Sequence, residues 1–436
     1  MSRPITRRSF LKQTSALTAG VAAWSFARSG RAAPGPNDKV RLAIVGCHNR
    51  GMNHITGCLA LPNAEIACVC DVDSHVMERG IAAVAKGQAR KPKGVKDLRR
   101  VLEDPEIDAV TLAVPDHWHV PAAILACAAG KHVYVEKPGS HNAQESEWIV
   151  AAARKYKRQV QMGTQRRSWP WVREAIQALH AGELGQLFFA RGWYTNHRPS
   201  IGRGKPAPVP EWLDYSLWQG PAPERPYQDN VIHYNWHWFW NWGTGELGNN
   251  GVHSLDLARW GLGVDLPRRV TYAGNRYHFH DDWETPDLGI ATFDFGDKGI
   301  VWEGQSCDPH GFENEDFGVN FYGEKGFMTI SSTAKIYDLN NKLVREIPAN
   351  AGGALSKDQR DTVHFANFLD GIREGKALNS EIEEGQKSTL LSHLGNIAWR
   401  TGHTINFDPA TRKITGDGEA SALWQRTYRD GWEPKI

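Results

Sequence analysis

The sequence predicts an α/β protein with two folded domains: a doubly wound parallel sheet, then an α+β domain with a large, mostly antiparallel open sheet. Two patterns predict this architecture. Between residues 40 and 135, short apolar runs alternate with helical stretches, as strands covered by helices on both faces do. Beyond residue 165 the runs are longer and alternate between apolar and polar residues, which is typical of antiparallel strands. With 436 residues, 41% of them hydrophobic, the chain can build both cores.

The individual elements follow from these patterns in chain order. In the first domain we expect strands over residues 40–45, 64–69, 107–114 and 132–135, and helices over 51–61, 95–102 and 121–129. In the second domain we expect strands over 186–194, 269–277, 288–295, 299–305, 318–321 and 327–331. Two further helices, over 358–374 and 383–401, are expected to pack back against the body.

The first 33 residues predict an export signal. Residues 6–12 read TRRSFLK, an uncharged run follows over 13–27, and small residues surround Ala32 and Ala33. This pattern is typical of a twin-arginine signal, so we expect passage through the twin-arginine translocon to the periplasm or another exported location. The run is too short and too weakly apolar to span a bilayer, and we expect no membrane span elsewhere.

The charge balance excludes one class of function, and the cysteine positions predict the state of the thiols. The formal net charge of +2 includes six basic side chains and no acid within residues 1–33, so the remaining chain is mildly acidic. That balance argues against a non-specific nucleic-acid binder. Five of the six cysteines fall in the first predicted domain, and Cys68 and Cys70 are too close in sequence for an ordinary disulfide. We therefore expect buried free thiols.

A glycine-rich turn joins the first strand to its helix: Gly46-Cys47-His48-Asn49-Arg50-Gly51. The first glycine permits a tight turn, the last lets helix and strand pack closely, and the helix N-terminus attracts a pyrophosphate. Asp71 ends the next strand, 20 residues after Gly51, where a carboxylate accepts hydrogen bonds from ribose hydroxyls and repels a 2′-phosphate. These features predict a Rossmann dinucleotide site that takes NAD rather than NADP, formed by Gly46, His48, Asn49, Arg50, Gly51 and Asp71.

His48 departs from the G-x-G-x-x-G fingerprint, because it occupies the middle position where glycine lets the backbone approach the phosphates. Three interpretations are open at this point. The imidazole turns outward, it donates a hydrogen bond to phosphate, or the loop no longer binds a dinucleotide tightly.

Three later motifs resemble the Gfo/Idh/MocA oxidoreductases, the glucose-fructose oxidoreductase and inositol dehydrogenase family. They are residues 113–119 (AVPDHWH), residues 136–138 (EKP) and residues 245–256 (GELGNNGVHSLD). The resemblance covers residues 39–401, and residues 213–227 and 393–396 look like the exported branch of that family. After the signal peptide predicted over 1–33, it implies a Rossmann domain over 34–163 and a substrate and oligomerisation domain over 164–436, with a homo-oligomer as the family expectation.

The resemblance also assigns roles to individual residues. Lys137 of the Glu-Lys-Pro motif corresponds to a catalytic and cofactor-contacting lysine, and His253 to the histidine of the Gly-x-His segment. Asn249 stands four residues before His253, where family dehydrogenases often carry an aspartate. Further cofactor contacts are expected from residues that follow the later strands: Pro115, His117, His119, Glu136, Lys137 and Gln165.

The chemistry can also be argued from these side chains alone. Removing hydride from a secondary carbinol requires a base for the hydroxyl proton and a cation for the developing alkoxide. His253 can be the base and Lys137 the cation. Asn249 cannot take a proton but can orient a sugar hydroxyl, so either His253 carries the acid/base work alone or the reaction differs from simple dehydrogenation.

An aromatic stretch, residues 234–242 (YNWHWFWNW), directly precedes the glycine-rich motif. Alternate tryptophans share one strand face or surround a loop, and such rings form platforms for pyranose stacking. The predicted substrate residues are Trp236, His237, Trp240, Arg166, Asn249 and His253. Core packing of some of these rings is the alternative.

Two histidine clusters could suggest a metal, residues 116–119 (DHWH) and 278–282 (HFHDD). We favour a loop over the nicotinamide for the first and an exposed turn for the second, and we predict no metal site.

Together these observations predict an enzyme that transfers hydride between a tightly held NAD(P) and a secondary hydroxyl of a sugar, glycoside or cyclitol. A redox-neutral enzyme that cleaves or epimerises glycosides through transient oxidation is the alternative enzyme. An exported carbohydrate-binding protein on a dehydrogenase fold is the alternative non-enzyme.

Overall fold

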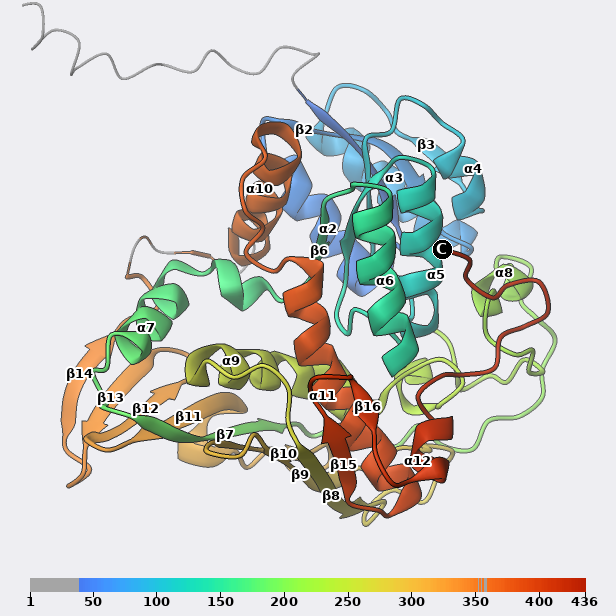
Figure 1. Cartoon of the computed structure of the whole chain (residues 1–436). Coiled ribbons are helices and arrows are strands. Elements are labelled where there is room, and N and C mark those ends of the chain that lie inside the picture. Colours follow the sequence, from blue (N-terminus) through green and yellow to red (C-terminus); the bar gives the residue numbers. More distant parts are fainter. Residues whose placement is uncertain (1–38, 352, 354, 357–358) are drawn as a thin grey trace, which may run out of the picture. The chain divides into compact units, whose positions relative to one another are not determined.

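The computed structural model describes residues 39–351, 353, 355–356 and 359–436. Their architecture consists of a six-stranded parallel sheet and a ten-stranded mixed sheet (Figure 1). The predicted fold class is thereby confirmed. The signal peptide predicted over residues 1–33 lies outside the described residues. Among those described, no helix has both the length and the apolar character needed to cross a bilayer.

The parallel sheet has the strand order β3-β2-β1-β4-β5-β6. Its strands are β1 (Val40–Val45), β2 (Ala64–Cys70), β3 (Lys93–Val95), β4 (Ala109–Leu112), β5 (His132–Val135) and β6 (Val160–Met162). The helices between them are α2 (Asn49–Leu59), α3 (Ser74–Gly87), α4 (Leu98–Leu102), α5 (Asp116–Ala128) and α6 (Ala143–Lys155). Strand order reverses at β1, which creates a crevice beyond the carboxyl ends of β1 and β4, where α/β proteins bind ligands.

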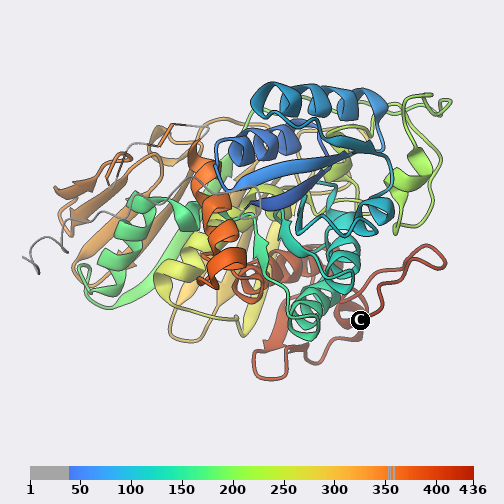
Figure 2. The same ribbon diagram turned by 90° about the horizontal axis from the view of Figure 1, so that it is seen from above.

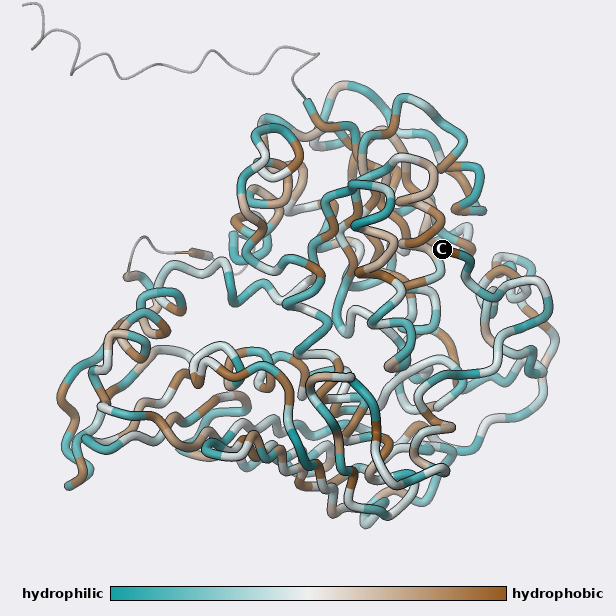
Figure 3. The backbone as a smooth tube through the Cα atoms, viewed as in Figure 1, coloured by the Kyte–Doolittle hydropathy of each residue, from teal (hydrophilic) through white to brown (hydrophobic). Residues whose placement is uncertain are grey.

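Alternate residues of β1 face two separate hydrophobic cores. Leu42 and Ile44 pack with α2 and α3, whereas Ala43 and Val45 pack with α5 and α6 on the other face. Each core is apolar because a parallel sheet is covered on both sides. The strands are accordingly rich in hydrophobic residues, brown in Figure 3, whereas the surface loops are mainly hydrophilic.

A helix from near the C-terminus completes the first core. Helix α10 (Gln359–Glu374) packs against α2 and contributes Phe365 and Phe368 to the cluster that contains Ile44. Figures 1 and 2 show this orange helix beside the blue elements of the first domain. The first core thus draws on residues beyond the boundary predicted at residue 163.

The larger sheet has the order β14-β13-β12-β11-β7-β10-β9-β8-β15-β16. Its strands are β7 (Leu187–Thr195), β8 (Arg269–Asn275), β9 (Leu288–Asp294), β10 (Gly299–Gln305), β11 (Phe317–Gly323), β12 (Gly326–Ile330), β13 (Ala334–Asp338), β14 (Leu343–Ile347), β15 (Ile405–Asp408) and β16 (Lys413–Ile414). All neighbours in this sheet are antiparallel except β7 and β10. The remaining helices are α7 (Pro170–His180), α8 (Tyr215–Gln219), α9 (Val252–Leu262), α11 (Ile382–Thr401) and α12 (Gly418–Ala422).

One expectation about local structure was wrong, and one alternative was decided. Helix α5 begins at Asp116, five residues earlier than predicted, so residues 116–119 form its first turn rather than a loop. Pro115 is the residue before the helix. Pro121 lies inside α5 and cannot donate a hydrogen bond to the His117 carbonyl oxygen, which instead accepts one from Arg426 at 2.7 Å. The aromatic stretch is not a strand, because residues 235–238 form a 3₁₀ turn.

All six cysteines are free thiols, five of them buried and Cys307 partly exposed. This confirms the expectation from their sequence positions. Burial raises the pKa of the Cys68 thiol to about 12, so this side chain behaves as a small apolar residue of the core.

Candidate active site

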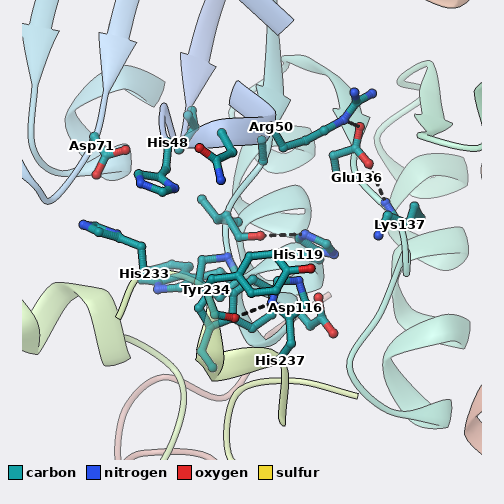
Figure 4. Close-up of a pocket in the computed structure, with 18 of the residues that line it drawn as sticks. His48, Arg50, Asp71, Asp116, His119, Glu136, Lys137, His233, Tyr234 and His237 are labelled. Carbon is teal, nitrogen blue, oxygen red and sulfur yellow. Dashed lines mark hydrogen bonds and ion pairs between the residues drawn. The ribbon is translucent and has the colours of Figure 1, made fainter. Parts of the chain in front are cut away.

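A cavity of about 490 Å³ lies beyond the carboxyl ends of β1, β2, β4 and β5. One wall comes from the parallel-sheet domain, and the facing wall comes from α8, the residues around the 3₁₀ turn and the start of α9. The volume is that of a small-molecule site. Figure 4 shows Lys137 and Glu136 at one end of the group of side chains and His48, Asp71 and His233 at the other.

The glycine turn has the geometry that a dinucleotide requires. Gly46 has φ +79°, and a Cβ there would lie 2.5 Å from the Ala113 carbonyl oxygen. A Cβ on Gly51 would overlap the Gly46 carbonyl oxygen, so helix α2 can approach β1 only because this residue is glycine. Helix α2 has no side-chain cap, and Asn49 and Arg50 of its first turn line the cavity, so its N-terminus is available to an anion.

Asp71 lies at the cavity edge with its carboxylate fixed by the backbone. One oxygen accepts a hydrogen bond from the Cys47 N–H at 2.6 Å, and the other accepts one from the Asp73 N–H at 3.0 Å. Burial raises the pKa of Asp71, and the two backbone donors oppose that shift. Each oxygen keeps a lone pair for a further donor, so the carboxylate suits a vicinal diol such as a ribose.

His48 turns its ring toward the other wall of the cavity. Its imidazole stacks on that of His233, with ring centroids 4.5 Å apart and an interplanar angle of 13°. Burial and the neighbouring His233 lower the pKa of His48, so its ring is neutral at neutral pH. The structure thus places the ring against a second imidazole rather than in solvent.

Glu136 lines the cavity, and one of its carboxylate oxygens is held by three side chains. Arg50 Nε donates at 2.7 Å and Gln165 Nε2 at 3.0 Å, while the His54 ring contacts the same oxygen at 3.0 Å. Burial acts to raise the pKa of Glu136, but Arg50 and His54 outweigh it and hold this pKa well below its usual range. Glu136 is therefore a permanent anion that positions Arg50 and Gln165.

Lys137 reaches across the cavity to the second domain. Its Nζ donates to the backbone oxygen of Asn249 at 2.7 Å and to Asn249 Oδ1 at 2.9 Å. Asn249 lies in a π-helical turn (Leu247–Gly251) at the start of α9. Burial lowers the pKa of Lys137, whereas Glu136 and Asp116 oppose that shift. Asn249 thus fixes the ammonium by accepting two hydrogen bonds from it, and its amide adds no charge to the site.

His253 lines the same cavity from the first turn of α9. Burial, together with the positive charges of Arg166 and Lys137, lowers the pKa of His253 well below 6.5. No described residue forms a hydrogen bond with its ring nitrogens. The neutral imidazole is consequently available to accept a proton from a bound molecule.

The aromatic stretch contributes one tryptophan to the cavity. Trp236 lines it and stacks on His237, with ring centroids 3.6 Å apart. Trp238 is fully buried against Trp283, and Trp242 is buried too. Trp240, predicted as a substrate residue, instead stacks on Trp399 and lies outside the cavity lining. Core packing therefore takes most of the rings, because the 3₁₀ turn points them in different directions.

Two other predicted site residues lie outside the cavity lining. His117 is buried in α5, with its Nε2 3.0 Å from the Trp218 carbonyl oxygen, and burial lowers its pKa to about 3. Arg166 lies over the Phe317 ring at 3.8 Å, beside the site rather than in it. His119 does line the cavity, with its Nε2 2.9 Å from the Val114 carbonyl oxygen. The two histidines are two residues apart in α5, which rotates one from the other by about 200° around the helix axis and explains why only one faces the cavity.

The structure brings together most of the remaining predicted residues. The cavity lining includes Gly46, His48, Asn49, Arg50, Asp71, Pro115, His119, Glu136, Lys137, Gln165, Trp236, His237, Asn249 and His253. Gly51 contributes through packing. Within the described residues, no three His, Cys, Asp or Glu side chains converge as a metal site requires.

Sequence reasoning missed a charged pair behind the substrate end of the cavity. Arg198 Nε donates to Glu246 Oε2 at 2.6 Å, and Arg198 also donates to the Tyr234 hydroxyl at 3.0 Å. Glu246 Oε1 accepts from Asn250 Nδ2 at 2.5 Å. Glu246 belongs to the glycine-rich motif and could have been found from it. Arg198 lies in an irregular segment, where no sequence pattern predicts which residues reach the cavity.

A second missed residue is Asp116, the first residue of α5. It lines the cavity and accepts a hydrogen bond from the Thr244 hydroxyl at 2.7 Å. Burial raises the pKa of Asp116 to about 7, although Thr244 and Lys137 act in the opposite direction.

A Rossmann fold with a glycine turn and a ribose-type aspartate defines a dinucleotide-binding protein, here with a partly buried lysine beside the site. Two family models match the chain. Residues 40–164 match the oxidoreductase family, NAD-binding Rossmann fold, and residues 202–434 match the oxidoreductase family, C-terminal alpha/beta domain. The chain belongs to the Gfo/Idh/MocA oxidoreductase family, and its first domain is an NAD-binding Rossmann domain.

Among curated relatives, a glycosyl hydrolase family 109 protein of Saccharopolyspora erythraea is 30% identical over 215 residues. That alignment covers 45% of this chain and 47% of the relative, so the chain spans about half the length of the first curated relatives it matches.

Solved structures share the fold. Levoglucosan dehydrogenase in complex with NADH superposes with a TM-score of 0.68 at 16% identity, covering 84% of this chain and 99% of the other. The WlbA dehydrogenase from Bordetella pertussis, in complex with NADH and UDP-GlcNAcA, gives 0.64 at 20% identity, covering 85% and 99%.

Proposed function

We propose that the protein oxidises a secondary hydroxyl of a sugar, glycoside or cyclitol with a tightly held NAD. The observation that carries this proposal is the placement of the Lys137 ammonium and the unpartnered His253 imidazole in one cavity with the glycine turn. An acid/base pair beside a dinucleotide site is what hydride transfer from a carbinol requires.

The roles follow from the charges of the two side chains. Bound NAD supplies the hydride acceptor. Neutral His253 accepts the hydroxyl proton, and Lys137 stabilises the oxygen as negative charge develops on it. Asn249 keeps the ammonium in place through two hydrogen bonds, so Lys137 needs little reorganisation when the substrate reacts. The carboxylate of Asp71 favours NAD over NADP, because it would repel a 2′-phosphate.

The substrate end of the cavity suits a polyhydroxylated ring. Trp236 and His237 provide a stacked aromatic surface, and Tyr194, Asn196 and Arg198 add hydrogen-bonding groups around it. The structural neighbours include levoglucosan dehydrogenase and a dehydrogenase with bound UDP-GlcNAcA, which supports a carbohydrate substrate.

A second candidate is redox-neutral cleavage of a glycoside. Oxidation of a ring hydroxyl to a ketone acidifies the neighbouring C–H, which permits elimination of the aglycone before water adds and hydride returns. Asn249 in place of an acid and the glycosyl hydrolase family 109 relatives favour this candidate. It needs further proton-transfer groups at the ring, and Tyr194, Tyr234 and His237 line the same cavity.

We further propose that the twin-arginine leader exports the protein with NAD already bound. A periplasmic enzyme has no free NAD pool, so the cofactor must stay bound through turnover. Sugar-to-sugar hydride transfer and the redox-neutral cycle both meet that condition, because each returns the cofactor to its starting state. A homo-oligomer is the proposed assembly.

The test begins with the nucleotide that accompanies the purified protein. Acid or heat denaturation should release near-stoichiometric NAD or NADH, quantified against protein and distinguished from NADP by enzymatic cycling. The holoprotein is then incubated with a panel of sugars and aryl glycosides, and products are analysed by mass spectrometry. Keto-sugar products would support oxidation. Free aglycone, together with a sugar whose ring C–H hydrogen has exchanged with solvent, would support redox-neutral cleavage. No nucleotide and no binding of added NAD would contradict both and favour a carbohydrate-binding protein.

A further inference from the structure

One segment of the second domain lies across the nucleotide end of the cavity. We call residues 212–233 the clasp segment. Leu213 forms an isolated antiparallel bridge with Asp73, directly after β2. The Ser74 N–H donates to the Trp212 carbonyl oxygen at 2.9 Å, and the Asp214 N–H donates to the Val72 carbonyl oxygen at 3.0 Å.

The clasp segment also contacts the other side of the nucleotide site. Trp118 Nε1 of α5 donates to the carbonyl oxygens of Leu217 at 3.2 Å and Trp218 at 3.0 Å. All three residues line the cavity, together with Asp71 and His233. The clasp segment is therefore attached to the first domain both after β2 and at α5, and the cavity lies between these attachments.

His48 and His233 make the contact between the clasp segment and the glycine turn itself. The two imidazoles stack with centroids 4.5 Å apart, and His233 Nε2 lies 2.8 Å from Asp73 Oδ2. Trp212 also stacks on His233, with ring centroids 5.9 Å apart and an interplanar angle of 25°. His233 is thus held by a carboxylate and a second ring, and it stacks on His48.

We propose that His48 retains the dinucleotide: by stacking on His233, it keeps the clasp segment closed over the cofactor site. This inference rests on the proposed function and gives a role to the residue that departs from the glycine fingerprint. A glycine at position 48 would leave His233 without this partner. The contact joins two walls of the cavity, so a bound dinucleotide leaves more slowly while the rings remain together.

The experiment measures the loss of native NAD from the full holoprotein. The wild type and each variant are purified with bound nucleotide and dialysed against buffer that contains an enzyme consuming free NAD, and retained nucleotide is quantified against protein over time. We expect His48→Gly and His233→Ala to lose NAD about fivefold faster, in line with the contribution of one aromatic pair. His48→Phe preserves a ring at this position and should retain NAD as the wild type does.

His75→Ala is the matched control, because this exposed imidazole packs on the same Trp212 at 5.7 Å but does not line the cavity. Its release rate should equal that of the wild type. Thermal unfolding of the apo forms checks that all variants fold.

Unchanged release from both His48→Gly and His233→Ala would overturn the inference while the proposed function stands. Tighter retention by His48→Gly would also overturn it, since the ring would then obstruct the cofactor. Equal acceleration by His75→Ala would show only a general loosening of the clasp segment. If the wild type neither contains nor binds NAD, the proposed function itself fails.

Discussion

At the scale of single residues, the site is organised around one amide and one ammonium group. An aspartate at position 249 would pair with Lys137 as an anion and could exchange a proton with it. Asn249 instead accepts from the ammonium through Oδ1 and through its backbone oxygen, without a charge of its own. The positive charge of Lys137 therefore remains available to a substrate oxygen, and proton acceptance is left to His253.

Replacing Lys137 should slow the reaction strongly and leave the cofactor in place. We expect Lys137→Met to slow reduction of the bound NAD by about 10²–10³-fold, the usual effect of removing one electrostatic stabiliser. Retained nucleotide should equal that of the wild type, because Gly46, Asp71 and the N-terminus of α2 hold it. Reduction is followed by near-ultraviolet absorbance after mixing with the identified sugar. A variant that reduces NAD at the wild-type rate would remove Lys137 from the mechanism.

The dependence of kcat/KM on pH should show two groups with shifted pKa values, the base His253 and the cation Lys137. Burial and the positive charges of Arg166 and Lys137 hold the pKa of His253 well below 6.5. Its imidazole is therefore neutral at pH 6.5, and kcat/KM should decrease only when the pH falls well below that value. Burial lowers the pKa of Lys137 from 10.5, so activity should fall as the pH rises through a value below 10.5. The measurement is log kcat/KM against pH.

The control for that profile is Asp116→Asn. Burial raises the pKa of Asp116 to about 7, so an inflection near neutral pH that disappears in this variant belongs to Asp116. An acid limb at or above pH 6.5 that survives the substitution would contradict the assignment of His253 as the base.

At the scale of elements, the glycine turn depends on how closely α2 packs on β1. Gly51→Ala places a methyl group on the Gly46 carbonyl oxygen, which must displace the first turn of α2. We expect a loss of about 2–4 kcal/mol in the free energy of unfolding, as overpacking against rigid backbone gives, and no retained NAD. Denaturant unfolding and nucleotide analysis measure the two effects.

Gly418→Ala provides the comparison for that variant. Gly418 is also a helical glycine, at the start of α12, but a Cβ there meets no atom within 4 Å. It should change the stability by less than about 1 kcal/mol and leave NAD bound. Equal loss of NAD in both variants would show that close packing at Gly51 is not required.

The sequence predicted helices and strands wherever the local pattern of apolar and polar residues was strongly periodic. The strands over residues 288–294 and 299–305 were found to within a residue, because each alternates and ends at a turn. Helix α5 was placed five residues too late, because residues 116–119 were expected to form a loop and instead make its first turn. Strands β13 to β16 were missed because they are short and lie at the two ends of the sheet, where pairing rather than pattern defines a strand.

The site was predictable to the extent that its residues belong to local motifs. Gly46, Asp71 and Lys137 each follow a strand at one sheet edge, so their proximity follows from topology. Trp240 was misplaced because alternation in sequence does not fix the direction of a side chain in the irregular turn that follows residues 235–238. Arg198 and His233 lie on a long irregular segment, and only tertiary contacts bring them to the cavity.

At the scale of the whole molecule, both domains line one cavity, and elements that follow the first domain in sequence pack against it. Helix α10 fills the core of the first domain, and the clasp segment closes on the residues after β2. The C-terminal residues Arg426 and Tyr428 both contact Glu145 of α6. A ligand held at the glycine turn is therefore bound by groups from both domains, so its binding should stabilise the second domain as well as the first.

Thermal unfolding tests this coupling, since tryptophan fluorescence reports mainly on the second domain. Of the 18 tryptophans, only Trp118 and Trp148 lie between residues 40 and 163. Saturating NAD at about 100 times its Kd should stabilise the folded chain by about 2.7 kcal/mol. We expect the midpoint of the fluorescence transition to rise as far as that of the far-ultraviolet circular dichroism of the same apoprotein sample. The second domain would be shown to unfold independently of the cofactor if NAD raised only the circular dichroism midpoint.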